Sequence, residues 1–315
     1  MCTFSIRPYV LAATLFAGTI SGFAQDNLVN SLKVNASDNS KASFKFTEVI
    51  NLQNTSVKNQ GSSGTCWSYS ANSFLESEMA RMGKQPVEIS QIFSARNTYI
   101  EKGKMYVRMH GAVTLGDGGS LYDVINMYKK YGAVPQSVYT GLNYGTDKNK
   151  FGEMAQITES ILQAVVKNPN GELTPNWQTA YAAVIDSYLG QVPTSFDYNG
   201  KKYTPQSFAK EVVGINPDDY IQISSFDTTP FYTKGMLLVP DNWAFEQVYN
   251  VKANDLTSIV DNALKKGYTV AWAGDVSEKT FSWKNGVAFV SDKNFDDMTP
   301  EEKAQHAVPE AGPNE

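Results

Sequence analysis

Residues 59–70 read NQGSSGTCWSYS, a loop rich in glycine and serine that leads into Cys66 and Trp67. From Trp67 to Met82 the sequence contains no glycine, no proline and no β-branched residue, which favours a helix over this range. Gly83 is placed to end that helix. Cys66 is therefore expected in the first helical turn, where unpaired backbone N–H groups and the positive end of the helix dipole favour a thiolate over a thiol.

The same helix has an apolar face. Four large apolar residues recur at spacings of three and four, which predicts one stripe buried against a core. They are Phe74, Leu75, Met79 and Met82.

The beginning of the chain differs in composition from the rest. An apolar run from Val10 to Ala17 follows a single basic residue, and Gly-Phe-Ala ends at Ala24, which is typical of a signal peptide at residues 1–24. The run is shorter than the about 20 residues that a membrane-spanning helix needs. We expect a periplasmic or secreted protein, with a linker at 25–44 and no membrane partner after cleavage.

Cleavage would remove Cys2 and leave Cys66 as the single cysteine. One thiol cannot form an intramolecular disulfide, and a leftover cysteine in an oxidising compartment is a candidate reactive group. The alternative, from composition alone, is a small buried apolar residue.

The overall composition excludes several classes of protein. The 315 residues are 42% hydrophobic, enough for a substantial core, and their net charge is −5, which argues against a nucleic-acid partner. Two histidines and the cysteines form no cluster at metal-ligand spacing, and the sequence contains no phosphate loop or dinucleotide motif. We therefore expect no metal and no cofactor.

The spacing of Gln60 and Thr65-Cys66-Trp67 resembles the active-site segment of papain-like cysteine peptidases. Ser63 stands where disulfide-linked members of that family have a cysteine. The segment is therefore more similar to the bleomycin hydrolase and aminopeptidase C branch.

Two further motifs extend the resemblance. The sequence VEISQ at 87–91 resembles the start of the family's second helix, with Ser90 able to cap it. The sequence GDGGS at 116–120 opens another helical pattern, and its Gly118 and Gly119 resemble the glycine pair that lines the family's cleft and binds the substrate backbone. Glycine suits that role because it lets another chain approach closely, although the pair alone is also typical of an ordinary loop before a helix.

The resemblance implies an α+β, papain-like fold with two lobes. Its helical first lobe is expected at 45–145, a helical insertion at 146–218, an incomplete β-rich lobe at 219–292 and an acidic connection at 293–315. Apolar periodicity predicts helices in the insertion at 151–166, 177–189 and 205–213. In the β-rich lobe we expect a helix at 256–266 and strands at 220–224, 236–239, 268–273 and 286–290.

The chemistry that the resemblance implies is hydrolysis of a peptide or protein substrate. The Cys66 thiolate would attack the scissile carbonyl to form an acyl-enzyme. The Gln60 side-chain amide and the Cys66 backbone N–H would stabilise the oxyanion.

The sequence does not plainly supply the base. His110 precedes the glycine pair and is interpreted as a surface or structural histidine. His306 has the correct order after Cys66, but Pro309 would break a central strand and residues 296–304 predict a charged helix. The family's Asn-Ser-Trp, which orients the base, does not occur. The hypothesis is that the chain is truncated before its catalytic histidine and is inactive in this form.

Two other functions remain open. One is a non-catalytic peptide-binding protein or pseudo-enzyme of the same fold. The other is a transglutaminase-like or cell-wall amidase protein, which ranks last because those proteins lack the Gln60–Cys66 spacing combined with the glycine pair. The sequence leaves exo- or endopeptidase action and the oligomeric state open.

Overall fold

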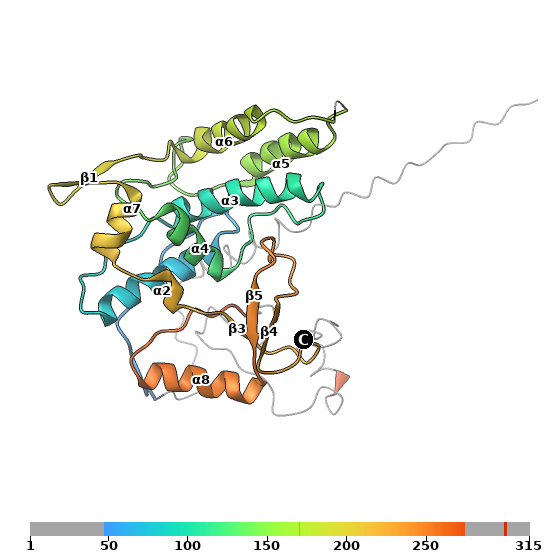
Figure 1. Cartoon of the computed structure of the whole chain (residues 1–315). Coiled ribbons are helices and arrows are strands. Elements are labelled where there is room, and N and C mark those ends of the chain that lie inside the picture. Colours follow the sequence, from blue (N-terminus) through green and yellow to red (C-terminus); the bar gives the residue numbers. More distant parts are fainter. Residues whose placement is uncertain (1–46, 170, 275–298, 301–315) are drawn as a thin grey trace, which may run out of the picture.

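The structure is a computed structural model that describes residues 47–169, 171–274 and 299–300 (Figure 1). The predicted signal peptide, most of the acidic connection and the strand expected at 286–290 lie outside these residues. The helices are α2 (Cys66–Arg81), α3 (Gln91–Arg108), α4 (Leu121–Tyr131), α5 (Gly152–Val166), α6 (Asn176–Leu189), α7 (Pro205–Phe208), the π-helix η1 (Ala209–Val213), the 3-10 helix η2 (Pro217–Asp219) and α8 (Ala253–Lys265). The strands are β1 (Phe196–Tyr198), β2 (Lys201–Tyr203), β3 (Ile223–Ser224), β4 (Thr233–Met236) and β5 (Gln247–Asn250).

The prediction for the helix after Cys66 is confirmed to within one residue at each end. Leu75 and Met79 are fully buried and Phe74 packs at the edge of the core. The expectation for Met82 is wrong, because 38% of this residue is exposed. Met82 follows the last helical residue, and the chain turns away at Gly83, whose φ of +74° suits glycine.

Helices α2, α3 and α4 form the helical lobe, with α4 packed against both α2 and α3. The starts of α3 and α4 are set by local hydrogen bonds. Ser90 caps α3 as predicted, since its hydroxyl accepts a hydrogen bond from the Phe93 N–H. Ser120 and Asp123 form a reciprocal capping box at the start of α4.

The insertion is helical where its periodicity predicts helices. Helices α5 and α6 match the expected ranges, while the range 205–213 divides into α7 and η1. The hairpin of β1 and β2, which precedes α7, was not predicted. Both α5 and α6 pack on α3, so the insertion covers the side of that helix remote from the sheet.

The β-rich lobe consists of a small sheet and α8. Its strand order is β3-β5-β4, with β3 parallel and β4 antiparallel to the central β5. Helix α8 agrees with the prediction, whereas β5 was missed and β3 and β4 are shorter than expected or shifted along the chain. The strand expected at 268–273 is wrong, because these residues form no ladder with the described sheet and Tyr268 instead lies under the Arg81 guanidinium, 4.1 Å from its ring centre.

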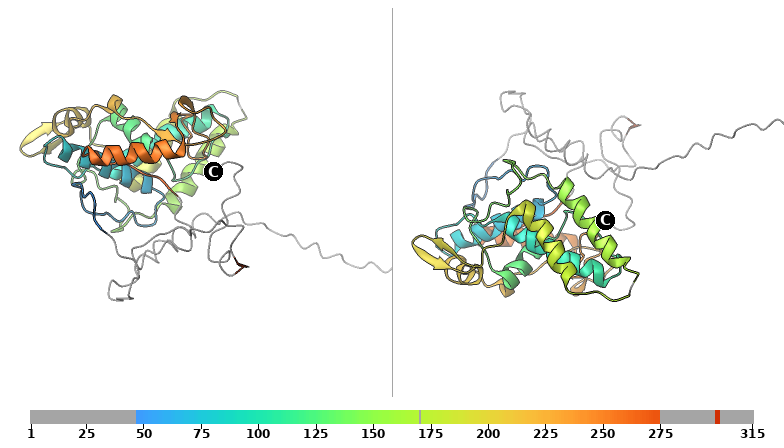
Figure 2. Two further views of the ribbon diagram at one scale, coloured as in Figure 1. Left: turned by 90° about the horizontal axis from the view of Figure 1, so that it is seen from below. Right: turned by 90° about the horizontal axis from the view of Figure 1, so that it is seen from above.

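The elements stack in layers. Seen from opposite ends, α8 lies nearest in one view and α5 and α6 lie nearest in the other, with the helical lobe between them (Figure 2). In the described part of the chain, no helix has both the length and the apolar content to cross a membrane.

Candidate active site

Cys66 is the first residue of α2, and its free thiol is exposed. Thr65 precedes the helix, but its side chain does not cap it. Among the described residues no acceptor takes the Cys66 backbone N–H. The thiol therefore lies beside a helix N-terminus whose donors remain available to an anion.

The loop before Cys66 is held by its own side chains. The Gln60 amide nitrogen donates to the Ser63 carbonyl at 2.6 Å, and the Ser63 hydroxyl donates to the Gln60 carbonyl at 2.8 Å. The same hydroxyl lies 2.6 Å from the Thr65 hydroxyl. Ser63 is buried. Its hydrogen bonds connect Gln60 to Thr65, which directly precedes α2. One N–H of the Gln60 amide remains free to bind another acceptor.

The loop is also fixed to the segment before α5. The Ser62 N–H donates to the Asn149 carbonyl at 2.7 Å, and the Phe151 N–H donates back to the Ser62 carbonyl at 3.2 Å. Gly61 has a φ of +64°, and a Cβ there would lie 2.5 Å from the Asn149 carbonyl oxygen. The turn therefore requires glycine at this position.

The structure brings the predicted glycine pair next to the start of helix α2. The Trp67 indole N–H donates to the Asp117 carbonyl at 2.9 Å, and the Gly64 N–H donates to the Asp117 carboxylate at 3.2 Å. A Cβ on Gly119 would lie 2.8 Å from the Trp67 ring. Motifs about fifty residues apart in sequence thus form one surface beside Cys66.

Close packing gives a reason for the glycines that the sequence did not suggest. A Cβ on Gly118 would lie 2.5 Å from a carboxylate oxygen of Asp241, and one on Gly119 would also meet Asp123. Gly119 leaves no room for a Cβ beside the Trp67 ring, whereas a Cβ on Gly118 would require the Asp241 carboxylate to shift. Their contact with substrate stays a prediction.

A buried lysine lies under the glycine segment. The Lys102 ammonium donates to the carbonyls of Gly116 at 3.0 Å and of Gly118 at 2.5 Å. Burial lowers the pKa of Lys102, and the nearby Asp241, Asp123 and Asp117 partly oppose that effect. Lys102 therefore fixes the backbone of the glycine segment from below.

Asp123 joins the glycine segment to the β-rich lobe. Its Oδ2 accepts hydrogen bonds from the Ser120 N–H at 2.8 Å and the Trp243 indole N–H at 3.0 Å. Burial raises the pKa of Asp123 from 3.8 to about 6, although these hydrogen bonds and Lys102 stabilise the carboxylate.

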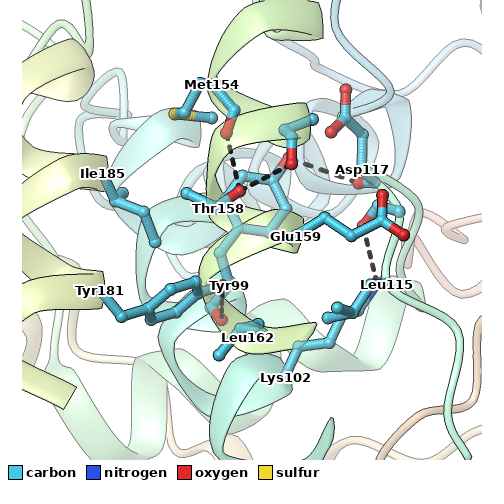
Figure 3. Close-up of a pocket in the computed structure, with 12 residues that line it drawn as sticks. Tyr99, Lys102, Leu115, Asp117, Met154, Thr158, Glu159, Leu162, Tyr181 and Ile185 are labelled. Carbon is cyan, nitrogen blue, oxygen red and sulfur yellow. Dashed lines mark hydrogen bonds between the residues drawn. The ribbon is translucent and has the colours of Figure 1, made fainter. Parts of the chain in front are cut away.

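A cavity of about 50 Å³ lies behind this surface, between α3, α5 and α6 (Figure 3). Its lining includes Tyr99 and Lys102 of α3, Asp117 of the glycine segment, Thr158 of α5 and Tyr181 of α6. This volume has room for little more than water. Cys66 does not line it, so the cavity is separate from the thiol site.

Comparison with known proteins shows what this chain is similar to. No family model matches the chain. Aminopeptidase C of Lactobacillus delbrueckii subsp. lactis is 25% identical over 83% of this chain and 67% of that protein. Aminopeptidase C of Streptococcus thermophilus is 22% identical over 74% of this chain and 62% of that protein. The chain is related to the aminopeptidase C branch of papain-like cysteine peptidases.

Two further comparisons concern a shorter stretch of sequence and the fold. The mitochondrial cysteine proteinase 1 of Saccharomyces cerevisiae is 27% identical over 40% of this chain and 29% of that protein. The crystal structure of PepW from Lactobacillus rhamnosis superposes with a TM-score of 0.56 and 22% identity, covering 80% of this chain and 70% of PepW. The predicted α+β, papain-like fold is confirmed. The chain spans about two thirds or less of the length of these curated aminopeptidase C and proteinase relatives.

Neither histidine of this chain is seen beside Cys66. One lies away from the site, and the other lies outside the described residues. His110 follows the end of α3, is exposed and has a φ of +53°. No hydrogen bond within the described chain connects His110 to Cys66. His306 lies outside the described residues, so its part in the site stays a prediction.

Sequence reasoning missed the side chains that support the glycine pair. Asp117 lies within the recognised motif, but only the adjacent glycines were assigned a role. Lys102 could have been noticed, because a lysine on the buried face of a helix needs acceptors. Asp241 and Trp243 carry no local signal, because their partners lie more than a hundred residues earlier in the chain.

Proposed function

We propose that this chain carries the nucleophile of a thiol aminopeptidase. The observation that supports the proposal is the exposed Cys66 thiol at the start of α2, beside a glycine segment that Trp67 and Asp117 hold in place. The names of the aminopeptidase C relatives support peptides as substrates.

In the proposed reaction, the Cys66 sulfur attacks the carbonyl carbon of the peptide bond. The amine portion of the substrate leaves with a proton, and a thioester joins the acyl portion to Cys66. Water then attacks the thioester, which releases the carboxylic acid and restores the thiol. The helix N-terminus favours the sulfur anion that begins this sequence.

The tetrahedral intermediate needs hydrogen-bond donors for its oxyanion. The Cys66 N–H and the second N–H of the Gln60 amide are available, because the described structure assigns neither to another acceptor. The bond from Gln60 to the Ser63 carbonyl would hold that amide in place.

The first experiment measures hydrolysis of an aminoacyl-coumarin by the full chain and by four variants. We expect Cys66→Ala to abolish turnover and Gln60→Ala to lower kcat by about 10²–10³. Cys2→Ala removes the other cysteine and is expected to leave kcat unchanged. Loss of turnover in His306→Ala would identify the base within this chain, whereas turnover that survives Cys66→Ala would contradict the proposal.

A second candidate function is peptide binding without catalysis. It is favoured by the arrangement of the described residues, in which the thiol and its neighbours are assembled while His110 lies at the far end of α3. Stoichiometric labelling of Cys66 by a peptide-based thiol reagent, together with no turnover of any aminoacyl-coumarin, would support this alternative.

We further propose that the protein is exported, on the basis of the apolar segment within residues 1–24. Expression of the full gene followed by mass analysis of the extracellular or periplasmic fraction tests this. A mature chain beginning near Gln25 is expected, and a protein that stays in the cytoplasm with residue 1 intact would contradict export.

A further inference from the structure

A carboxylate lies directly against the glycine pair. If Gly118 carried a Cβ, that atom would lie 2.5 and 2.7 Å from the two carboxylate oxygens of Asp241. The next residue, Gly119, is in the same kind of close contact with the Trp67 ring. From the nucleophile outward, the contacts therefore run from Trp67 to Gly119, then to Gly118 and Asp241.

The segment that carries Asp241 is fixed on both sides. Asn242 donates through its side chain to the carbonyls of Leu237 at 2.7 Å and of Glu246 at 3.0 Å, which closes the turn between β4 and β5. Trp243 is buried and donates to Asp123 on α4. The carboxylate is thus held beside Gly118 by the two residues that follow it in the chain, on a turn that Trp243 anchors to the helical lobe.

The charge of Asp241 is not neutralised by a direct partner. The Asp241 residue is partly exposed, and within the described chain it accepts no hydrogen bond and forms no ion pair. Lys102 attracts it electrostatically, but the Lys102 N–H groups are directed to the Gly116 and Gly118 carbonyls. Since Asp117 and Asp123 act on the same ammonium, carboxylates outnumber cations around the glycine pair.

We propose that Asp241 is a specificity residue that binds the free α-ammonium group of a peptide lying along Gly118 and Gly119. This inference rests on the proposed function, because it takes Cys66 as the nucleophile. A peptide that extends past Gly119 meets the Asp241 carboxylate, and a chain ending there in an ammonium group gains a charge-assisted hydrogen bond. A longer or acetylated peptide would instead leave the carboxylate without a cation and would have to displace it.

The experiment compares two thiol-reactive probes on the full chain. Both are the same dipeptide vinyl sulfone, one with a free amino terminus and one N-acetylated, and the rate of Cys66 labelling is followed by intact mass. We expect the free-amine probe to label about tenfold faster, as one charge-assisted hydrogen bond allows. In Asp241→Asn the ratio of the two rates is expected to fall to about one, through slower labelling by the free-amine probe alone.

Matched variants separate this effect from general damage. Asp261→Asn removes an exposed carboxylate on α8 and is expected to keep the wild-type ratio. Asp241→Ser provides a second substitution if the asparagine variant does not fold, and it is expected to lose the preference as well. A third probe is acetylated but has lysine as its first residue. It tests whether the Asp241 carboxylate binds a basic side chain instead of the α-ammonium group.

The outcomes are distinct. Equal labelling of the wild-type chain by the free and acetylated probes overturns the inference but leaves Cys66 as nucleophile. A preference that survives in both Asp241 variants also overturns it. Fast, Asp241-dependent labelling by the lysine probe would show that the carboxylate binds a basic side chain instead of the α-ammonium. Failure of every probe to modify Cys66 would contradict the proposed function itself.

Discussion

The helical lobe and the β-rich lobe differ in the burial of their helices. Helix α2 contains fully buried residues along its length, among them Leu75 with no exposed surface. Helix α8 contains none, and Ile259 on it remains 42% exposed in the described chain. The lobe with the thiol is therefore stabilised by its own core, whereas the β-rich lobe contacts it through a few specific side chains.

Several contacts between the lobes are hydrogen bonds. They include Trp243 to Asp123, Asn126 to Glu246 and Tyr122 to the Tyr220 carbonyl. A hydrogen bond contributes little net stability but defines a geometry. The position of Asp241 beside Gly118 therefore depends on polar contacts whose strength can change with pH, while helix α2, which begins at Cys66, is held in the core by apolar side chains such as Leu75 and Met79.

The largest expected effect is on the core of the helical lobe. Leu75→Ala should lower the free energy of unfolding by about 2–5 kcal/mol, because it leaves a cavity in a closely packed core. The matched truncation Ile259→Ala on α8 should cost about 0.5 kcal/mol, as at other exposed sites. Urea unfolding followed by tryptophan fluorescence measures both, and equal losses would contradict the difference between the lobes.

A smaller effect is expected from the pH dependence of Asp123. Its pKa is raised to about 6 in the folded chain, so between about pH 4 and 6 the folded state binds more protons than the unfolded state. Stability should therefore fall as pH rises through this window, by at most about 3 kcal/mol from this residue.

The variant Asp123→Asn keeps an acceptor for Ser120 and Trp243 but cannot titrate. Urea midpoints measured from pH 4 to 6 should fall less steeply for this variant than for the wild type. Asp117, whose pKa burial also raises, should leave a residual slope, and the Asp261→Asn control should retain the wild-type slope. An unchanged slope in Asp123→Asn would show that Asp123 does not cause the dependence.

The smallest effect is expected at the exposed ion pair of Lys129 on α4 with Asp218 on η2, whose side chains are 58% and 66% exposed. Solvent screens such pairs, so Lys129→Ala should leave the urea midpoint unchanged within error. Lys129→Arg, which keeps the charge, serves as the control. A clearly lower urea midpoint in Lys129→Ala but not in Lys129→Arg would contradict this expectation. It would show that the exposed ion pair stabilises the folded chain.

Local sequence predicts the helices well and the strands poorly. The limits of α2, α5 and α6 follow from apolar periodicity and from terminating residues such as Gly83, whereas α8 begins three residues before its predicted start. The hairpin of β1 and β2 was missed although Asn199-Gly200, with φ values of +49° and +76°, is a strong signal for a tight turn. The strand expected at 268–273 has suitable residues but no described partner, and a strand needs a partner to form.

Cys66, Gln60 and the glycine pair can be recognised from sequence because each belongs to a short motif whose spacing reflects local backbone geometry. The supporting contacts cannot, because they join positions far apart in the chain. Lys102 binds the carbonyl of Gly118, and Asp241 packs on the same residue from the β-rich lobe. Side-chain type and spacing encode helix α2 and the thiol at its start, whereas the charge beside Gly118 and Gly119 arises only when distant segments pack together.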